Sequence, residues 1–233
     1  MLPVAILMGG LGTRLGDLTK KLPKCLIEIN GKPFIDWQMD SLIQSGYTDF
    51  VFCVSHKSEM IQDYLGDGLR LGVNIKYSFD GPPPLGTGGA IKKALPLLGN
   101  NFAMIYGDSY LPINYFAAEQ NFLSSKMQVV MSVYKNQNNY DNSNVELSNQ
   151  EVINYDKFNQ SAKMKHIDYG LSYFRGSAFE FVSDLEVFDL GSLYHSLAQN
   201  GMLGGYEVFE RFYEIGSHVG INDFSEYLEG KKK

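Results

Sequence analysis

The apolar residues of this chain form short runs that alternate with amphipathic stretches through its first half. The runs hold almost no polar side chain, which is typical of strands buried on both faces, and the stretches between them have helical spacing. The pattern predicts strands at 4–8, 26–29, 50–54, 73–77 and 102–106, with helices at 33–45, 58–65 and 90–98. This alternation predicts an α/β fold, a Rossmann-like, mainly parallel sheet flanked by helices.

The second half loses this regular alternation. A helix at 114–125 and a strand at 127–134 lead into an asparagine-rich loop, and short strands follow at 144–147, 151–155 and 167–174. Such closely spaced strands predict a small antiparallel extension of the mixed sheet. Helices at 192–199 and 222–228 complete the pattern. Because no repeat and no linker interrupts it, we expect one domain over residues 1–230.

Composition narrows the class of protein. The 233 residues are 44% hydrophobic and 13% aromatic, as in a folded globular protein. The net charge of −6 and the absence of a basic stripe before the terminal lysines argue against nucleic acid as a partner. Cys25 and Cys53 and the four histidines show no zinc spacing, and no apolar run approaches the roughly 20 residues that span a membrane. We therefore expect a reduced, cytoplasmic protein.

The first strand leads directly into glycine. Leu7 and Met8 are followed by Gly9, Gly10 and Gly12, and then by Thr13 and Arg14. Bare backbone can turn consecutive N–H groups toward an anion, and the neighbouring arginine adds a fixed positive charge. A glycine-rich turn between two core elements is the alternative, and the Thr-Arg pair favours phosphate binding.

The spacing of the glycines distinguishes this run from two known types of phosphate-binding loop. Leu15 stands where a dinucleotide fingerprint needs its third glycine, and no Gly-Lys-Ser/Thr ends the run as in a Walker A loop. Residues 9–15, followed by Pro23 and Lys24, instead resemble the signature of sugar-1-phosphate nucleotidyltransferases, the NDP-sugar pyrophosphorylases. The resemblance covers nearly the whole chain. It implies a nucleotide-binding half at 1–110 and a sugar-binding half at 111–230.

Two further motifs in the first half carry the resemblance. Residues 85–90, Leu-Gly-Thr-Gly-Gly-Ala, look like the family's loop beside base and ribose, although a rigid loop before a helix would explain them too. Asp108 follows a buried strand in Gly-Asp-Ser, where an aspartate can simply form a turn. The resemblance places a Mg²⁺ ligand at this aspartate.

The matches in the second half are looser. Asp156 and Lys157 resemble the family's acidic-lysine pair, and Asp168, Tyr169 and Gly170 resemble the turn that lines its sugar pocket. A charged strand end and a glycine within a strand are the alternatives. Residues 212–217 resemble an aromatic-x-Asp-x-Gly-Thr motif whose acid is a second metal ligand. This chain has Glu214 there, so direct contact with the metal is less certain.

The resemblance implies that an NTP and a sugar 1-phosphate give an NDP-sugar and pyrophosphate, with Mg²⁺ as cofactor. By matched position, the implied catalytic residues are Arg14, Lys24 and Asp108; the nucleotide-binding residues are Leu7, Gly9, Gly10, Gly12, Thr13, Arg14, Asp80, Gly86, Thr87 and Gly88; the sugar-phosphate-binding residues are Lys24, Asp156, Lys157, Tyr169 and Gly170; and the metal ligands are Asp108 and Glu214.

The expected substrates are GTP and a heptose 1-phosphate. The short chain and residues 85–90 look most like guanylyltransferases of manno-configured heptose 1-phosphate, and Asp80 could accept both N1–H and N2–H₂ of guanine. Asp80 could equally cap the turn at Gly81. A cytidylyl- or uridylyltransferase of another sugar or polyol phosphate, and a non-catalytic nucleotide-sugar sensor, remain alternatives. The resemblance also allows a homodimer.

Overall fold

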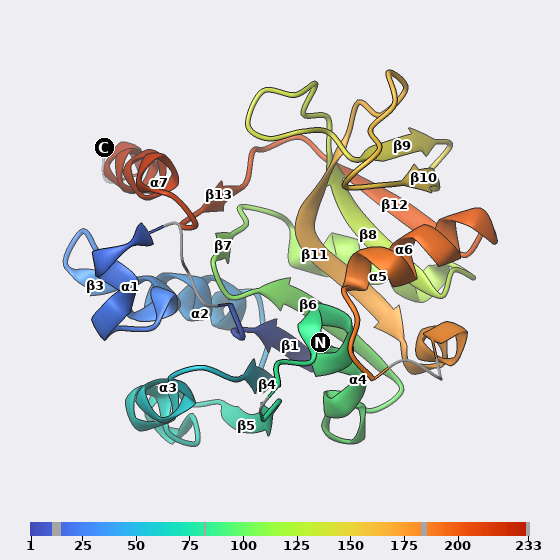
Figure 1. Cartoon of the computed structure of the whole chain (residues 1–233). Helices are drawn as coiled ribbons and strands as arrows, with labels where there is room; N and C mark the ends of the chain where they lie inside the picture. Colours follow the sequence, from blue (N-terminus) through green and yellow to red (C-terminus); the bar gives the residue numbers. More distant parts are fainter. Residues whose placement is uncertain (11–14, 82, 183–185, 232–233) are drawn as a thin grey trace.

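The computed structural model describes residues 1–10, 15–81, 83–182 and 186–231. Within these residues, nine strands form one sheet in the order β5-β4-β1-β6-β11-β8-β12-β10-β9 (Figure 1). Its first four strands are parallel: β1 (Val4–Leu7), β4 (Asp49–Val54), β5 (Asn74–Phe79) and β6 (Asn101–Tyr106). The four residues of β1 are all buried because the strand lies between β4 and β6 with helices on both faces. The parallel α/β half is thus confirmed.

The second half continues the same sheet. Its long strands are β8 (Val129–Tyr134), β9 (Val145–Ser148), β10 (Glu151–Tyr155), β11 (Ile167–Arg175) and β12 (Leu203–Val208). β11 runs antiparallel between β6 and β8, and the β9–β10 hairpin closes the edge. The mixed sheet with antiparallel strands is therefore as predicted.

One long strand, β12, was not predicted. Its sequence contains Gly204 and Gly205, which normally indicate a loop, yet it pairs in parallel with β8 over six residues. A β-carbon at Gly205 would collide with the side chain of Leu147 and lie 3.3 Å from Val152. The glycine therefore lets the β9–β10 hairpin pack closely on β12, a requirement that only the folded chain reveals.

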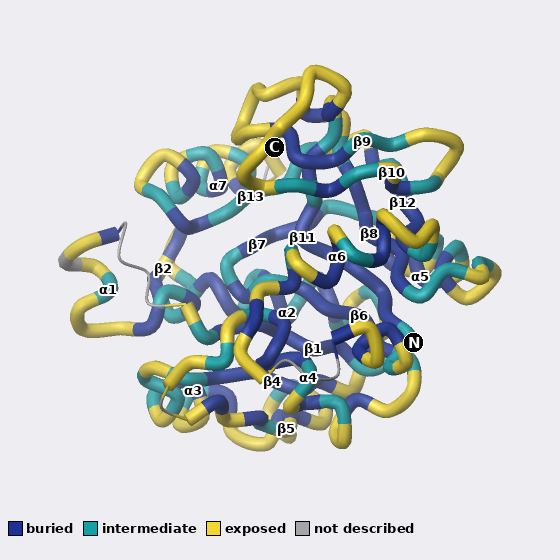
Figure 2. The backbone as a smooth tube through the Cα atoms, turned by 45° about the vertical axis from the view of Figure 1, so that its right-hand side comes forward, coloured by how far each residue is buried: buried dark blue, intermediate teal, exposed yellow. Residues whose placement is uncertain are grey.

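Helices cover both faces of the sheet. Leu, Ile, Met and aromatic side chains of α2 (Phe34–Gln44), α3 (Ser58–Leu65) and α5 (Tyr115–Ser124) pack into one core layer. Those of α4 (Gly86–Leu98) and α6 (Leu190–Gln199) fill the opposite layer. Figure 2 shows the buried strands running between these exposed helical surfaces. None of the helices in the described ranges is long and apolar enough to span a membrane.

Three helices differ from the sequence-based expectation. α4 begins at Gly86 rather than Ala90. The carbonyl oxygen of Phe188 accepts the N–H groups of Gly88 and Gly89 and so satisfies the first turn of the helix. α7 (His218–Gly230) begins four residues early, since the Ser217 hydroxyl accepts from Gly220 N and caps it. α1 (Asp17–Lys21) forms where the sequence pattern predicted no helix. The remaining short elements are β2 (Glu28–Ile29), β3 (Lys32–Pro33), β7 (Ser109–Tyr110), β13 (Tyr213–Glu214) and 3₁₀ turns at Lys24–Leu26, Leu69–Leu71 and Gly176–Val182.

Candidate active site

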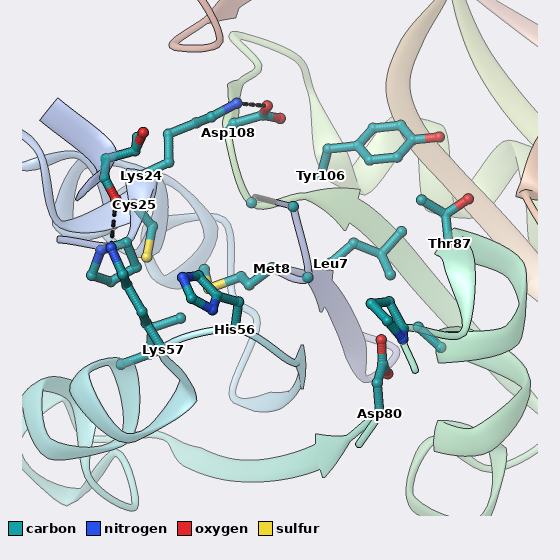
Figure 3. Close-up of a pocket in the computed structure, with 18 of the residues that line it drawn as sticks. Leu7, Met8, Lys24, Cys25, His56, Lys57, Asp80, Thr87, Tyr106 and Asp108 are labelled. Atoms are coloured by element: carbon teal, nitrogen blue, oxygen red, sulfur yellow. Dashed lines mark hydrogen bonds and ion pairs between the residues drawn. The ribbon is translucent and has the colours of Figure 1, made fainter. Parts of the chain in front are cut away.

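A cavity of about 340 Å³ opens at the carboxyl ends of the parallel strands, the edge where open α/β sheets bind ligands (Figure 3). Its wall is built from the ends of β1, β4, β5 and β6, from residues 19–25, and from the start of α4. Eight residues expected from the sequence line it: Leu7, Gly9, Gly10, Lys24, Asp80, Gly86, Thr87 and Asp108. The fold thus brings the glycines after β1, the second glycine motif and the acid after β6 into one site.

Lys24 and Asp108 form an ion pair across the cavity. Lys24 Nζ lies 2.8 Å from Asp108 Oδ2, and the two side chains are 16% and 34% exposed. Asp108 follows β6, whereas Lys24 opens a 3₁₀ turn 84 residues earlier in the chain. The pair places one cation and one anion on the cavity wall. Either charge can turn to a ligand of opposite sign while remaining on the cavity wall.

A second lysine on the wall, Lys57, was not expected from the sequence. Its backbone has a φ of 56°, in the left-handed region, and it precedes α3. Its ammonium donates to the carbonyl oxygens of Thr19 and Lys20, with a distance of 2.8 Å to the latter. Lys57 therefore ties the loop after β4 to α1, the segment that leads to Lys24. A lone lysine after Ser-His gives no sequence signal for this contact.

Asp80 lies in the cavity wall after β5 and is only 8% exposed. Its Oδ1 is buried and has no hydrogen-bond partner among the described residues. Burial raises the pKa of this carboxyl, while the Leu85 N–H and the charge of Lys93 oppose that rise. The carboxylate lies beside the glycines that follow β1, because a β-carbon at Gly9 would lie 3.5 Å from Asp80 Oδ2. This buried oxygen is therefore free to accept a hydrogen bond from a ligand in the cavity.

The second glycine motif has a structural task that the sequence did not reveal. Gly86 has a φ of 73°, and a β-carbon there would lie 2.5 Å from the carbonyl oxygen of Phe188. The N–H of Gly88 donates to that same oxygen at 2.9 Å, and a β-carbon on Gly88 would overlap the Phe188 ring. Gly88 does not line the cavity. Here the glycines let α4 pack against the segment before α6.

Thr87 joins the two halves of the molecule through its hydroxyl. This group donates to Asp189 Oδ2 at 3.0 Å and accepts from Leu190 N at 2.9 Å. Asp189 lines the cavity, caps α6 by accepting from Gly191 N, and lies 3.4 Å from Lys157 Nζ. Its own pKa is lowered, because these hydrogen bonds and the Lys157 charge outweigh its burial. The sequence analysis did not single out Asp189.

The expected sugar-half residues lie in two different environments. Lys157 pairs with Asp189 at the cleft, but Asp156 is exposed and accepts from the N–H groups of Phe158 and Asn159 in its own turn. The ring of Tyr169 is buried in the core layer of α2 and packs on Phe212, on the opposite face of β11 from Asp168. Gly170, with a φ of 98°, donates to Asp168 Oδ1 at 2.9 Å.

Glu214 lies on β13, paired with Ser109 beside Asp108. One of its carboxylate oxygens accepts from Gly216 N and the other from the Ser217 hydroxyl, 3.1 Å away. Both oxygens thus serve the turn before α7. Glu214 does not line the cavity, in contrast to Asp108.

We expect Glu214→Ala to affect stability and Mg²⁺ activation together. Losing two hydrogen bonds at the turn should cost about 1–2 kcal/mol in the free energy of unfolding, which lowers Tm by about 2–4 °C per kcal/mol. The Mg²⁺ concentration that gives half-maximal activity should rise less than in Asp108 variants. Differential scanning fluorimetry and a Mg²⁺ titration measure the two effects. If Tm falls but the Mg²⁺ titration is unchanged, Glu214 stabilises the turn before α7 and has no role in Mg²⁺ activation.

The chemistry of this wall fits Mg²⁺. No group of three or more His, Cys, Asp or Glu side chains gathers as a metal cage within the described ranges. Mg²⁺ does not require one, since it commonly binds one or two carboxylates, water and substrate phosphates. Asp108 supplies an accessible carboxylate on the cavity wall beside Gly107. Gly12, Thr13 and Arg14 lie outside the described residues.

Comparison with known proteins agrees with this arrangement. Residues 4–190 match the model of the nucleotidyl transferase family. The chain is 42% identical over 109 residues to D-glycero-α-D-manno-heptose 1-phosphate guanylyltransferase of Campylobacter jejuni, covering 47% of this chain and 48% of the relative. It is also 42% identical over 116 residues to N-acetylmuramate α-1-phosphate uridylyltransferase of Neisseria meningitidis, covering 49% and 50%.

These alignments span about half the length of the curated relatives. The fold matches over a longer range: the inositol-1-phosphate CTP transferase of T. maritima superposes with a TM-score of 0.83 at 20% identity, covering 98% of this chain and 95% of that one. The family model covers most of the sheet and all residues that line the cavity. The chain belongs to the nucleotidyl transferase family.

Proposed function

We propose that the protein is a sugar-1-phosphate nucleotidyltransferase that makes an NDP-sugar and pyrophosphate from an NTP and a sugar 1-phosphate. The observation that carries this proposal is the Lys24–Asp108 pair on a cavity that Gly9, Gly10 and Asp80 also line. One cavity thus offers three kinds of group: glycine backbone for the phosphates of a nucleotide, the Lys24 ammonium for a second phosphate, and the Asp108 carboxylate for a metal ion. The activities of the relatives support the same reaction.

The reaction needs charge and alignment more than it needs a base. A phosphate monoester has a second pKa near 6, so a sugar 1-phosphate is largely a dianion at neutral pH and attacks without losing a proton to the protein. In this proposal the Lys24 ammonium leaves Asp108 and holds the attacking phosphate. The amides of Gly9 and Gly10 hold the triphosphate, so that the oxygen of the sugar phosphate faces the α-phosphorus in line with the departing pyrophosphate.

Asp108 is the residue that would hold Mg²⁺, together with oxygens of the nucleotide. When bound, the ion neutralises charge on the triphosphate and so favours departure of pyrophosphate. When Lys24 turns to the sugar phosphate, the Asp108 carboxylate is left free for the metal ion. Binding of the sugar phosphate and binding of Mg²⁺ therefore favour each other electrostatically. Glu214 lies on β13, opposite Ser109 of β7, and would add negative charge near Asp108.

For the base, we propose guanine. A carboxylate can accept from N1–H and N2–H₂ together. Asp80 presents to the cavity a buried oxygen that has no partner among the described residues. Adenine, cytosine and uracil lack that pair of donors, so each would leave the Asp80 charge unsatisfied. The Campylobacter jejuni relative acts on a manno-heptose 1-phosphate, and we propose that class of sugar here.

Asp80→Ala is expected to lower kcat/KM for GTP by about 10- to 100-fold and to leave that for CTP nearly unchanged. The size follows from one bidentate contact, about 1–3 kcal/mol. Kinetics with both nucleotides in wild type and variant measure it, with Asp63→Asn on the exposed face of α3 as a charge-matched control. A wild type that prefers CTP or UTP, or a variant that keeps its full GTP preference, would remove guanine recognition from Asp80.

The same contact predicts a pH dependence. Burial raises the pKa of Asp80, so its carboxylate becomes protonated at a higher pH than an ordinary aspartate, whose pKa is about 3.9. The ratio of kcat/KM for GTP to that for CTP should therefore fall as pH falls through the raised pKa. Taking the ratio cancels the titration of the sugar phosphate. In Asp80→Ala the ratio should not vary with pH.

A panel assay tests the proposed function as a whole. Purified protein, Mg²⁺, each of four NTPs and a set of sugar 1-phosphates are incubated, and released pyrophosphate is measured. Pyrophosphate that requires both substrates supports an enzyme. Nucleotide-sugar binding without pyrophosphate under every pairing would support the sensor alternative instead.

A further inference from the structure

The turn that carries Asp108 is held by a side chain from an earlier part of the chain. Gln38 lies on α2, which runs beside β7, and is only 1% exposed (Figure 1). Its Nε2 donates to the carbonyl oxygen of Tyr106 at 2.9 Å and to that of Ser109 at 2.6 Å. These two residues enclose Gly107 and Asp108 in the sequence. One side-chain amide therefore holds both ends of the turn.

The amide of Gln38 has a fixed orientation. Carbonyl oxygens only accept hydrogen bonds, so the N–H₂ group must face the turn and the amide oxygen must face away from it. That oxygen, Oε1, is buried and has no partner among the described residues. Such an acceptor is destabilising, and the other buried positions of this helix face are apolar, among them Ile35, Met39 and Leu42. What glutamine adds to this apolar face is its pair of hydrogen bonds to the turn.

Backbone contacts hold the same turn from two other segments. The N–H of Gly107 donates to the carbonyl oxygen of Leu7 at 2.9 Å, and a β-carbon on Gly107 would lie 2.8 Å from that oxygen. The carbonyl oxygen of Asp108 accepts from Ile215 N at 3.0 Å. The turn is thus joined to the end of β1, to the segment after β13 and, through Gln38, to α2.

The carboxylate of Asp108 has fewer restraints than its backbone. It pairs with Lys24 at 2.8 Å and lies 3.5 Å from the Ser109 hydroxyl. In the proposed function Lys24 leaves this pair for the sugar phosphate. The direction of the carboxylate then depends mainly on the backbone of the turn, which Gln38 helps to hold.

We propose that Gln38 is a positioning residue that acts through Asp108. Its two hydrogen bonds keep the turn where the Asp108 carboxylate meets a divalent cation on the cavity wall. The inference rests on the proposed function and adds to it a residue that does not line the cavity. Losing such support behind a metal ligand typically costs about 10- to 100-fold in metal affinity or activity, and a displacement of about 1 Å can cost about 100-fold in rate.

Gln38→Met tests this role, because methionine is similar in length but has no donor. Mn²⁺ replaces Mg²⁺ as the probe, since both prefer oxygen ligands and Mn²⁺ binding can be followed by electron paramagnetic resonance. The titration is made with and without the unreactive α,β-methylene analogue of GTP. With the analogue, Kd for Mn²⁺ should rise about tenfold in the variant. In turnover kcat should fall about 10- to 100-fold, while KM for the NTP changes by less than about twofold. Gln44→Met, at the exposed end of the same helix, should keep wild-type values.

A double-mutant cycle separates positioning from general support of the fold. If Gln38 acts through Asp108, then Gln38→Met should cause no further loss of kcat in protein that already carries Asp108→Asn. Leu42→Val changes a buried residue on the same face of α2. It should lower Tm and leave the Mn²⁺ affinity unchanged.

Gln38→Glu is the second variant if Gln38→Met does not fold. It keeps the shape of glutamine and places an oxygen where the N–H₂ group donated, so Mn²⁺ affinity and kcat should again fall. Wild-type Mn²⁺ affinity and kcat in a folded Gln38 variant, or an equal loss of kcat in the Asp108→Asn background, would overturn the inference and leave the enzyme in place. Because Mn²⁺ binding is read without turnover, a wild type that releases no pyrophosphate would overturn the proposed reaction, and the Mn²⁺ affinities would still decide the role of Gln38.

Discussion

Asp108→Asn is expected to lower kcat by roughly a thousandfold with the fold intact. Asparagine has nearly the shape of aspartate, but its neutral amide is a poor Mg²⁺ ligand, and loss of metal charge stabilisation costs several kcal/mol. At 1.36 kcal/mol per factor of ten, about 4 kcal/mol corresponds to that loss in rate. Asp108 is one-third exposed at its position after β6, so the substitution leaves no buried group without a partner except Lys24.

The measurement is kcat at saturating substrates, with Tm recorded for the same preparation. Asp63→Asn makes the same change of charge on an exposed helix and should keep wild-type kcat. A second control, Asp108→Glu, retains the carboxylate and should keep more activity than the amide. If Asp108→Asn retains more than a tenth of wild-type kcat, the metal role assigned to Asp108 is wrong.

Lys24→Met is the second large effect that we expect. Methionine retains much of the apolar stem of lysine but has no ammonium to hold the attacking phosphate. KM for the sugar 1-phosphate should rise about 100-fold, since an ion pair with phosphate in a partly buried site contributes about 3 kcal/mol. KM for the NTP should change little. Steady-state kinetics with each substrate varied in turn separates the two constants.

Lys157→Met is the comparison for this prediction. We expect it to raise KM for the sugar 1-phosphate by less than Lys24→Met does, because Lys157 pairs with Asp189 beside the cavity and does not line it. Lys24→Met has a further consequence: it frees Asp108 from its cation, so half-maximal activation should need less Mg²⁺ than in the wild type. A rise in KM for the NTP alone would place Lys24 on the triphosphate. Unchanged kinetics would leave Lys24 as a surface residue.

The parts of the site that follow strands could be predicted from the sequence. The apolar run at 4–8 is followed by Gly9, and that at 102–106 is followed by Gly107 and Asp108. Parallel strands end at one edge of the sheet, so a local pattern was enough to bring these residues together. Of the expected residues in the glycine motif at 85–90, Gly86 and Thr87 line the cavity and Gly88 does not. The helical start of this motif and its packing against Phe188 depend on a segment 100 residues away.

Contacts between distant segments could not be predicted in this way. Lys24 meets Asp108 across 84 residues and Lys57 meets the carbonyls of α1 across 37, and no local pattern encodes either contact. The sugar half shows the same limit. A turn sequence at 168–170 does not reveal that Tyr169 is buried in the core layer of α2. The pairing of β11 with β8 is irregular between Asp168 and Ser172, and such an irregularity depends on the partner strand.

The most direct test of the central claim is a ³¹P NMR measurement on the wild type with Mg²⁺, GTP and D-glycero-α-D-manno-heptose 1-phosphate. The account predicts that the GTP and sugar 1-phosphate signals fall together while pyrophosphate and the two coupled phosphorus signals of a GDP-sugar grow in equal amounts. The spectrum should stay unchanged when the sugar phosphate is omitted. Persistence of both substrates with this sugar and with every other NTP and sugar 1-phosphate, by a protein that is folded and binds nucleotide, would contradict it.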